Sequence, residues 1–122
     1  MYDLENNIYI FGEIGWDVDA KMVSEQLRAI EGDKVTVNIH SPGGNVSEGF
    51  AIHDILVQSG KEITTVITGL CASIGTVIAL AGKTRKMTAN SQFMIHNPWM
   101  SIRGGDADEY ENSCRCAEIL AL

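Results

Sequence analysis

Apolar residues recur along this chain with two different spacings. Short, largely apolar stretches at residues 8–11, 35–39 and 63–68 have the length and β-branched content of buried strands. Residues 20–30 and 46–58 instead place apolar side chains three and four positions apart, which predicts amphipathic helices. Strand and helix therefore alternate, and this alternation indicates an α/β domain with a largely parallel sheet.

Polar residues mark where the two long helices begin. Asp19 directly precedes the first helical segment and is expected to cap it. Asn45, with Glu48 three residues later, has the spacing of a capping pair for the second helix. Gly32 and Gly60 follow these segments and are expected to end them.

The second half of the chain is expected to add a buried helix, two strands and a last helix. Residues 74–81 are almost wholly apolar, which predicts a short helix buried on all sides. Residues 85–88 and 92–95 are typical of two strands of a hairpin, joined by a turn at residues 89–91. Asp106 has the position of a cap for a last helix that continues to the end of the chain.

Composition narrows the classes of function. The 122 residues predict a single domain spanning 1–122, with a formal charge of −7 and no basic stripe, so a nucleic-acid partner is not expected. No apolar run reaches the roughly 20 residues of a membrane span, and the acidic start lacks the pattern of a signal peptide. Cys71, Cys114 and Cys116 have no disulfide-framework or zinc-site spacing, which favours reduced thiols in a cytoplasmic setting and no metal.

Three segments at the predicted ends of strands carry residues suited to nucleophilic catalysis. Ser73 lies where a strand turns into the buried helix, and a serine hydroxyl needs a nearby base to attack a carbonyl. His96 follows another strand, 23 residues later, and an imidazole suits a general base near neutral pH. The segment 41–44, Ser-Pro-Gly-Gly, offers unobstructed backbone N–H groups to an oxyanion, with Gly43 N–H as one donor and Ile74 N–H as the second.

Each segment also has a plainer interpretation. Taken alone, Ser73 is more often a helix cap, and a lone histidine such as His96 is more often structural. The Pro-Gly-Gly segment is also typical of a turn, but it is not a Walker loop because no Gly-Lys-Ser/Thr follows it. His40 and His53 lack partners at metal-ligand spacing and are interpreted as structural, and Trp99 as a packing aromatic that could line a substrate groove.

Taken together, the segments resemble the Clp protease proteolytic-subunit superfamily. The resemblance rests on Ser-Pro-Gly-Gly at 41–44, Gly-x-x-Ala-Ser at 69–73 and Met-Ile-His-x-Pro at 94–98, in that order. It implies the Clp/crotonase fold, a β-β-α superhelix rather than a doubly wound sheet. Within the superfamily, the opening at 8–15 and the Asn-Pro-Trp at 97–99 are most like the phage and prophage head maturation proteases, which trim capsid and scaffold proteins. The housekeeping Clp subunit is the neighbouring alternative.

The resemblance also implies roles for individual residues. Ser73 would be the nucleophile, His96 the general base, and Gly43 and Ile74 the oxyanion-hole donors. A peptide substrate would lie as an added strand beside the segment that begins at Gly44. No cofactor is implied. The implied assembly is a heptamer-like homo-oligomeric ring in the cytoplasm, which for a phage protein is that of the bacterial host, and an AAA+ unfoldase partner is implied only for the housekeeping type.

One departure from the family pattern leaves alternatives open. The family's third catalytic residue would fall after position 122, since Asp106 and Asp108 follow His96 too closely and have the pattern of cap residues. We therefore expect a chain truncated at its C-terminus, which would be poorly active without the orienting acid. The alternatives are a catalytically silent ring or capsid-assembly component, a crotonase-type acyl-CoA enzyme, and a Ser-Lys protease using Lys83 or Lys86.

Overall fold

The computed structural model describes residues 6–95. Within them lie five strands and three helices in the order β-α-β-α-β-α-β-β. The predicted last helix, Trp99, Cys114 and Cys116 lie outside the described residues.

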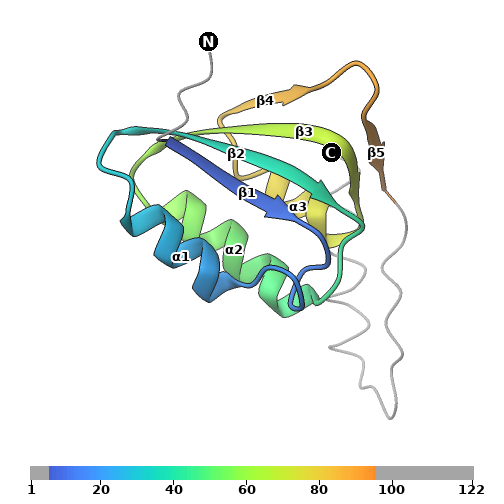
Figure 1. Ribbon diagram of the computed structural model, residues 1–122, viewed down its shortest axis with the longest axis horizontal. Helices are drawn as coiled ribbons and strands as arrows, with labels where there is room; N and C mark the ends of the chain where they lie inside the picture. Colours follow the sequence, from blue (N-terminus) through green and yellow to red (C-terminus); the bar gives the residue numbers. More distant parts are fainter. Residues whose placement is uncertain (1–5, 96–122) are drawn as a thin grey trace.

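A parallel sheet forms one layer of the molecule (Figure 1). Its strands are β1 (Asn7–Phe11), β2 (Lys34–Ser41), β3 (Glu62–Ala72), β4 (Thr84–Met87) and β5 (Gln92–Met94). The order across the sheet is β1-β2-β3-β4, and β5 also pairs with β3. The carboxyl ends of β1, β2 and β3 therefore meet at one edge, where α/β folds usually place their sites.

The predicted hairpin of residues 85–88 and 92–95 is wrong. Both strands run parallel to β3 and pair with it in succession, β4 along residues 64–67 and β5 along residues 70–72. The turn between them stays on β3, because Thr88 N–H donates to the carbonyl of Ile67 (3.0 Å). The 11-residue β3 exposes more backbone groups than the four residues of β4 can satisfy, so β5 completes the pairing of the same edge.

The helices α1 (Ala20–Arg28), α2 (Val46–Gln58) and α3 (Ile74–Ala79) cover one face of the sheet (Figure 1). Helices on both faces would be needed for a doubly wound fold, so the arrangement of the described helices on one face agrees with the fold that the family resemblance implies. Within residues 6–95, no helix is long and apolar enough to cross a bilayer.

The caps of the two long helices follow the prediction except at one side chain. Asp19 Oδ1 accepts from Met22 N–H (2.9 Å) and Asn45 Oδ1 accepts from Glu48 N–H (2.9 Å). The Glu48 carboxylate does not complete the capping pair, since it accepts from Ala20 N–H (3.2 Å) at the start of α1. Asn45 N–H donates instead to the carbonyl of Ile14 (2.9 Å), so the two helix starts and the β1–α1 loop are joined by hydrogen bonds.

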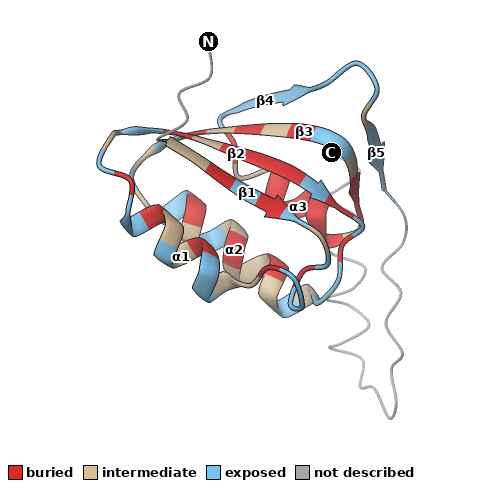
Figure 2. Ribbon diagram, viewed as in Figure 1, coloured by how far each residue is buried: buried red, intermediate tan, exposed pale blue. Residues whose placement is uncertain are grey.

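The core lies between the sheet and the helices, whereas the opposite face of the sheet is more exposed (Figure 2). All six residues of α3 are buried, as the sequence predicted, and α2 approaches α3 closely at Gly49. A Cβ at Gly49 would overlap the side chain of Ile74, so this glycine is what allows the two helices to touch. The burial of α3 fixes the position of the residue before it, Ser73, relative to the core.

Candidate active site

Ser73 occupies the tight turn between β3 and α3 in an unusual backbone conformation. Its φ is 57° and its ψ is −128°, and it is the one non-glycine residue with positive φ among residues 6–95. A non-glycine residue at such angles costs on the order of 1–3 kcal/mol, and residues of this kind cluster at active sites. Ser73 occupies the N-cap position of α3, but its side chain makes no capping hydrogen bond to the helix, so capping does not explain why a serine stands there.

Hydrogen bonds to the backbone on both sides hold this strained turn in place. The Ser73 carbonyl accepts from Thr76 N–H (3.1 Å) and from the buried Thr76 hydroxyl (2.5 Å). Ser73 N–H donates to the carbonyl of Met94 at the end of β5 (3.3 Å). The main-chain groups of the serine are therefore occupied, and its hydroxyl has no hydrogen-bond partner among the described residues.

Gly43 lies directly against Ser73. A Cβ built on Gly43 would lie 2.6 Å from Cβ of Ser73, 3.2 Å from its Oγ and 3.0 Å from the carbonyl oxygen of Ala72. Gly43 also has φ +101°, so a larger residue would be excluded both by backbone conformation and by contact. The structure thus brings together two segments that are 30 residues apart in the sequence.

The two backbone N–H groups predicted to form an oxyanion hole differ in whether they already make a hydrogen bond. Ile74 N–H, at the start of α3, has no acceptor within residues 6–95. Gly43 N–H donates to Oγ of Ser41 (3.0 Å), a hydroxyl that is fully buried. Gly43 N–H must therefore leave or share this bond before it can donate to an oxyanion at Ser73.

One edge of the Gly44 backbone faces away from the β1–α1 loop. Ile14, in the β1–α1 loop, donates its N–H to the carbonyl of Gly43 (2.8 Å), and its carbonyl accepts from Asn45 N–H (2.9 Å). These two bonds flank Gly44 and form a parallel bridge between Ile14 and Gly44. In an extended chain the N–H and the carbonyl of Gly44 itself point to the side opposite Ile14. Within the described chain, neither its N–H nor its carbonyl makes a hydrogen bond, so this edge is open to an additional strand.

The strand that leads to His96 runs beside the serine. Met94 pairs with Ala72 and accepts the hydrogen bond from Ser73 N–H, and His96 follows Met94 by two residues. His96 itself lies outside the described residues.

Two of the other histidine and lysine candidates are also placed. His53 Nδ1 lies 3.0 Å from Oδ1 of the adjacent Asp54, in the middle of α2, which fits a structural role. Lys83 N–H donates to the carbonyl of Ile63 (2.9 Å), near the start of β3. Ile63 pairs with Val35, whereas Cys71, near the serine, pairs with Ser41. The backbone of Lys83 therefore lies six residues of β2, or about 20 Å, from the end of the sheet that carries Ser73. Lys83 is therefore too distant to serve as a base for Ser73.

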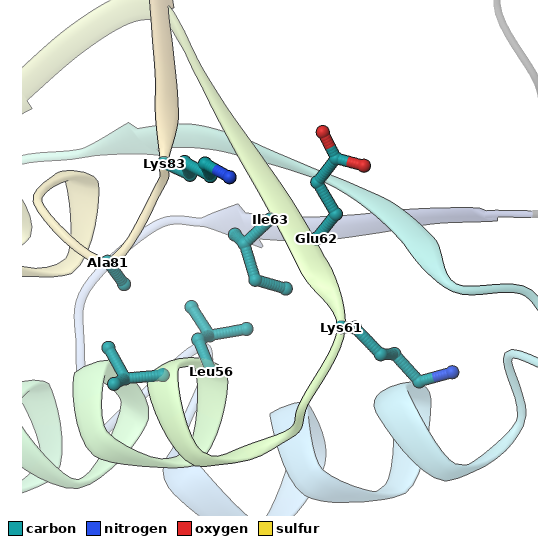
Figure 3. Close-up of a pocket in the computed structure, with 7 residues that line it drawn as sticks. Leu56, Lys61, Glu62, Ile63, Ala81 and Lys83 are labelled. Carbon is teal, nitrogen blue, oxygen red and sulfur yellow. The ribbon is translucent and has the colours of Figure 1, made fainter.

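One pocket lined by described residues lies away from the serine (Figure 3). It has a volume of about 200 Å³ and lies between the end of α2 and the start of β3, with Leu56, Ile63 and Lys83 in its lining. Lys61 turns its ammonium group away toward the carbonyls of Ile30 (3.1 Å) and Gly32 (2.5 Å). Residues 6–95 hold no group of three or more histidine, cysteine or acidic side chains that could bind a metal.

Cys71 lies two residues before the serine but is not itself a candidate nucleophile. Its thiol is fully buried, and burial raises its pKa from 9.0 to about 12 because the thiolate would be poorly solvated. A cysteine reacts as the thiolate, so Cys71 is chemically inert in the folded protein.

We predict that Cys71 resists alkylation by iodoacetamide at pH 8 in the folded state. A pKa of about 12 instead of 9.0 lowers the thiolate fraction at pH 8 roughly 10³-fold, before the shielding of the sulfur is counted. The measurement is mass spectrometry of the Cys71 peptide after brief alkylation, with and without denaturant. Rapid modification of Cys71 without denaturant would show that the strand before Ser73 opens readily.

The side chains of two polar residues near the serine make contacts that the sequence does not predict. Ser41 belongs to the predicted oxyanion segment and His40 is interpreted as structural, and in the structure Ser41 Oγ accepts from Gly43 N–H and His40 Nδ1 accepts from Leu70 N–H in β3 (3.1 Å). The only sequence signal for the second contact is Gly69, whose φ of +77° and lack of a side chain leave room for the imidazole.

Comparisons with known proteins agree on one family. The model of the family described as Clp protease matches residues 2–120. The chain is similar to the solved structure of ClpP1 from Listeria monocytogenes, with a TM-score of 0.81 and 32% identity over 96% of this chain and 70% of that one. It is similarly close to the N165D mutant of that protein, with a TM-score of 0.78 and 32% identity over 95% and 68% of the two chains.

Proposed function

Because this chain belongs to the Clp protease family, we propose that it cleaves peptide bonds through an acyl-enzyme on Ser73, with His96 as general base. The observation that carries the proposal is Ser73 itself, a strained serine at a strand–helix turn whose side chain lies against Gly43 and whose hydroxyl has no hydrogen-bond partner within residues 6–95. Strained turns of this kind expose the nucleophile in other serine hydrolases.

The position of β5 supports His96 as the base. The Met94 carbonyl accepts from Ser73 N–H, and two residues of chain span at most about 7 Å, so the sequence distance from Met94 to His96 is compatible with the proposed role. A neutral imidazole would accept the serine proton during attack and return it to the leaving amine.

Gly43 and Ile74 are the proposed backbone donors to the oxyanion. Among the described residues Ile74 N–H has no acceptor, and it opens a helix whose first N–H groups lack intrahelical partners. Gly43 N–H would exchange its bond with Ser41 Oγ for one with the developing oxyanion, or share the two. The free edge of Gly44 would pair with the substrate backbone as an added strand.

We further propose that the natural substrates are capsid or scaffold proteins of a phage or prophage, and that the protein works as a homo-oligomeric ring in the cytoplasm. The support is the resemblance of residues 8–15 and 97–99 to head maturation proteases. A housekeeping Clp-type subunit fed by an AAA+ unfoldase is the second candidate, favoured by the likeness to ClpP1 from Listeria monocytogenes. Ring size and the domain span of 1–122 remain predictions from the sequence.

Covalent labelling tests the proposed chemistry. We expect a fluorophosphonate probe to modify the complete protein at Ser73 alone, because only an activated serine attacks the phosphorus rapidly. Ser24, on α1, provides the internal comparison and should remain unmodified. A folded protein that takes up no probe would favour the catalytically silent assembly component instead.

A further inference from the structure

The pairing of β2 with β3 is interrupted immediately before the serine. Ile39 pairs with Ile67, and the next pair is Ser41 with Cys71. Between these pairs β2 contributes one residue, His40, and β3 contributes the three residues 68–70. The extra residues form a bulge, which leaves backbone groups of β3 without partners on β2.

The imidazole of His40 takes the place of the missing backbone acceptor. Its Nδ1 accepts from Leu70 N–H at 3.1 Å. Nδ1 can accept only when it carries no proton, so this hydrogen bond requires the tautomer with its hydrogen on Nε2. The ring reaches this position because Gly69 has no side chain, since a Cβ there would lie 2.5 Å from Nδ1. It also contacts Phe11 edge to face, with centroids 5.8 Å apart.

The bulge is mechanically connected to both proposed catalytic residues. Residues 70–72 continue from the bulge to Ser73. Each of them pairs with a residue of β5: Leu70 with Gln92, Cys71 with Phe93, and Ala72 with Met94. A change in the path of Leu70 would therefore move the serine relative to Gly43 and would alter the strand that leads to His96. Displacements on the order of 1 Å can lower rates about 10²-fold.

We propose that His40 is a positioning residue for the proposed peptidase reaction, acting through the hydrogen bond from Leu70 N–H to its Nδ1. This inference rests on the proposed function, because it assigns to His40 the placement of the nucleophile. His40 does not touch substrate. It fixes where the last three residues of β3 begin, and through them the direction of the Ser73 hydroxyl.

Two substitutions separate the hydrogen bond from the packing of the ring. His40→Phe keeps an aromatic ring against Phe11 but removes the acceptor. His40→Asn removes the ring but keeps an acceptor, since its Oδ1 is the same number of bonds from Cα as Nδ1 of histidine. We expect His40→Phe to lower kcat for a peptide substrate about 10- to 100-fold with little change in KM, and His40→Asn to stay within about threefold of wild type.

Amide hydrogen exchange at Leu70 supplies a readout that does not depend on catalysis. Exchange should accelerate in His40→Phe and remain slow in His40→Asn, with Ile67 N–H, before the bulge, as the internal reference. If His40→Phe retains kcat, or if both variants lose it equally, the acceptor is not what positions the serine and the proposal is overturned. If wild-type protein shows no Ser73-dependent hydrolysis at all, the proposed function fails, and the exchange at Leu70 still reports whether the imidazole holds the bulge.

Discussion

Replacing Ser73 by alanine is expected to lower kcat/KM for peptide hydrolysis by about 10⁴-fold or more and to leave the free energy of unfolding nearly unchanged. The loss follows from removing the attacking oxygen. Stability should be preserved because the Ser73 side chain makes no capping bond and its backbone bonds to Thr76 and Met94 do not involve the hydroxyl. Steady-state kinetics on a fluorogenic peptide and thermal unfolding of the complete protein measure the two quantities.

The combination with His96→Ala makes this prediction more specific. Residues that act as one catalytic unit are strongly non-additive, so the double variant should be hardly slower than Ser73→Ala alone. Ser24→Ala, the same change on α1, should leave the kinetics unaltered. Peptide hydrolysis that persists in Ser73→Ala would remove the serine from the mechanism, and losses that multiply in the double variant would show that the two residues act separately.

Gly43→Ala is expected to have the second largest effect, about a 10²- to 10³-fold loss in kcat, comparable to losing one oxyanion donor. The new methyl group would meet Ser73 Cβ at 2.6 Å and the carbonyl oxygen of Ala72 at 3.0 Å. These are parts of the β3–α3 turn that cannot move without disturbing α3, so the segment 41–44 must shift instead. The same variant is also expected to lose about 1–2 kcal/mol of stability, because its φ of +101° is unfavourable for alanine.

Gly60→Ala separates the effect of backbone conformation from that of contact. Gly60 has φ +74°, but a Cβ there would meet nothing within 4 Å, and the residue lies after α2, away from the serine. We expect a stability loss like that of Gly43→Ala with unchanged kcat. If Gly43→Ala proves as active as Gly60→Ala, the close approach of Gly43 to Ser73 has no role in the reaction.

The local elements were largely predictable because they depend on local patterns. The caps at Asp19 and Asn45, the bounds of α2 and the burial of α3 all follow from side chains within a few residues of one another. The arrangement of β4 and β5 was not predictable in this way. Two short strands joined by a turn have the same pattern whether they pair with each other or both pair with β3.

In the site, too, features that depend on sequence motifs were predictable and features that depend on long-range strand pairing were not. Gly43 and Ser73 were expected to meet because family motifs carry that information, and the structure brings them together. The positive φ of Ser73 gives no signal in the sequence, since serine is not a residue that marks such angles. The bond from Leu70 to His40 depends on a bulge in the pairing of two strands about 30 residues apart, and no periodicity within either strand reveals it.

The central claim is that the hydroxyl of Ser73 and the imidazole of His96 face one bound substrate, and a peptidyl chloromethyl ketone tests it most directly. Such a reagent forms a hemiketal with the serine and then alkylates the imidazole beside it. We predict a single adduct on His96 in the complete protein, formed at least about 10²-fold more slowly in Ser73→Ala. Alkylation of His96 at the same rate in Ser73→Ala, or modification elsewhere with His96 untouched, would contradict the account.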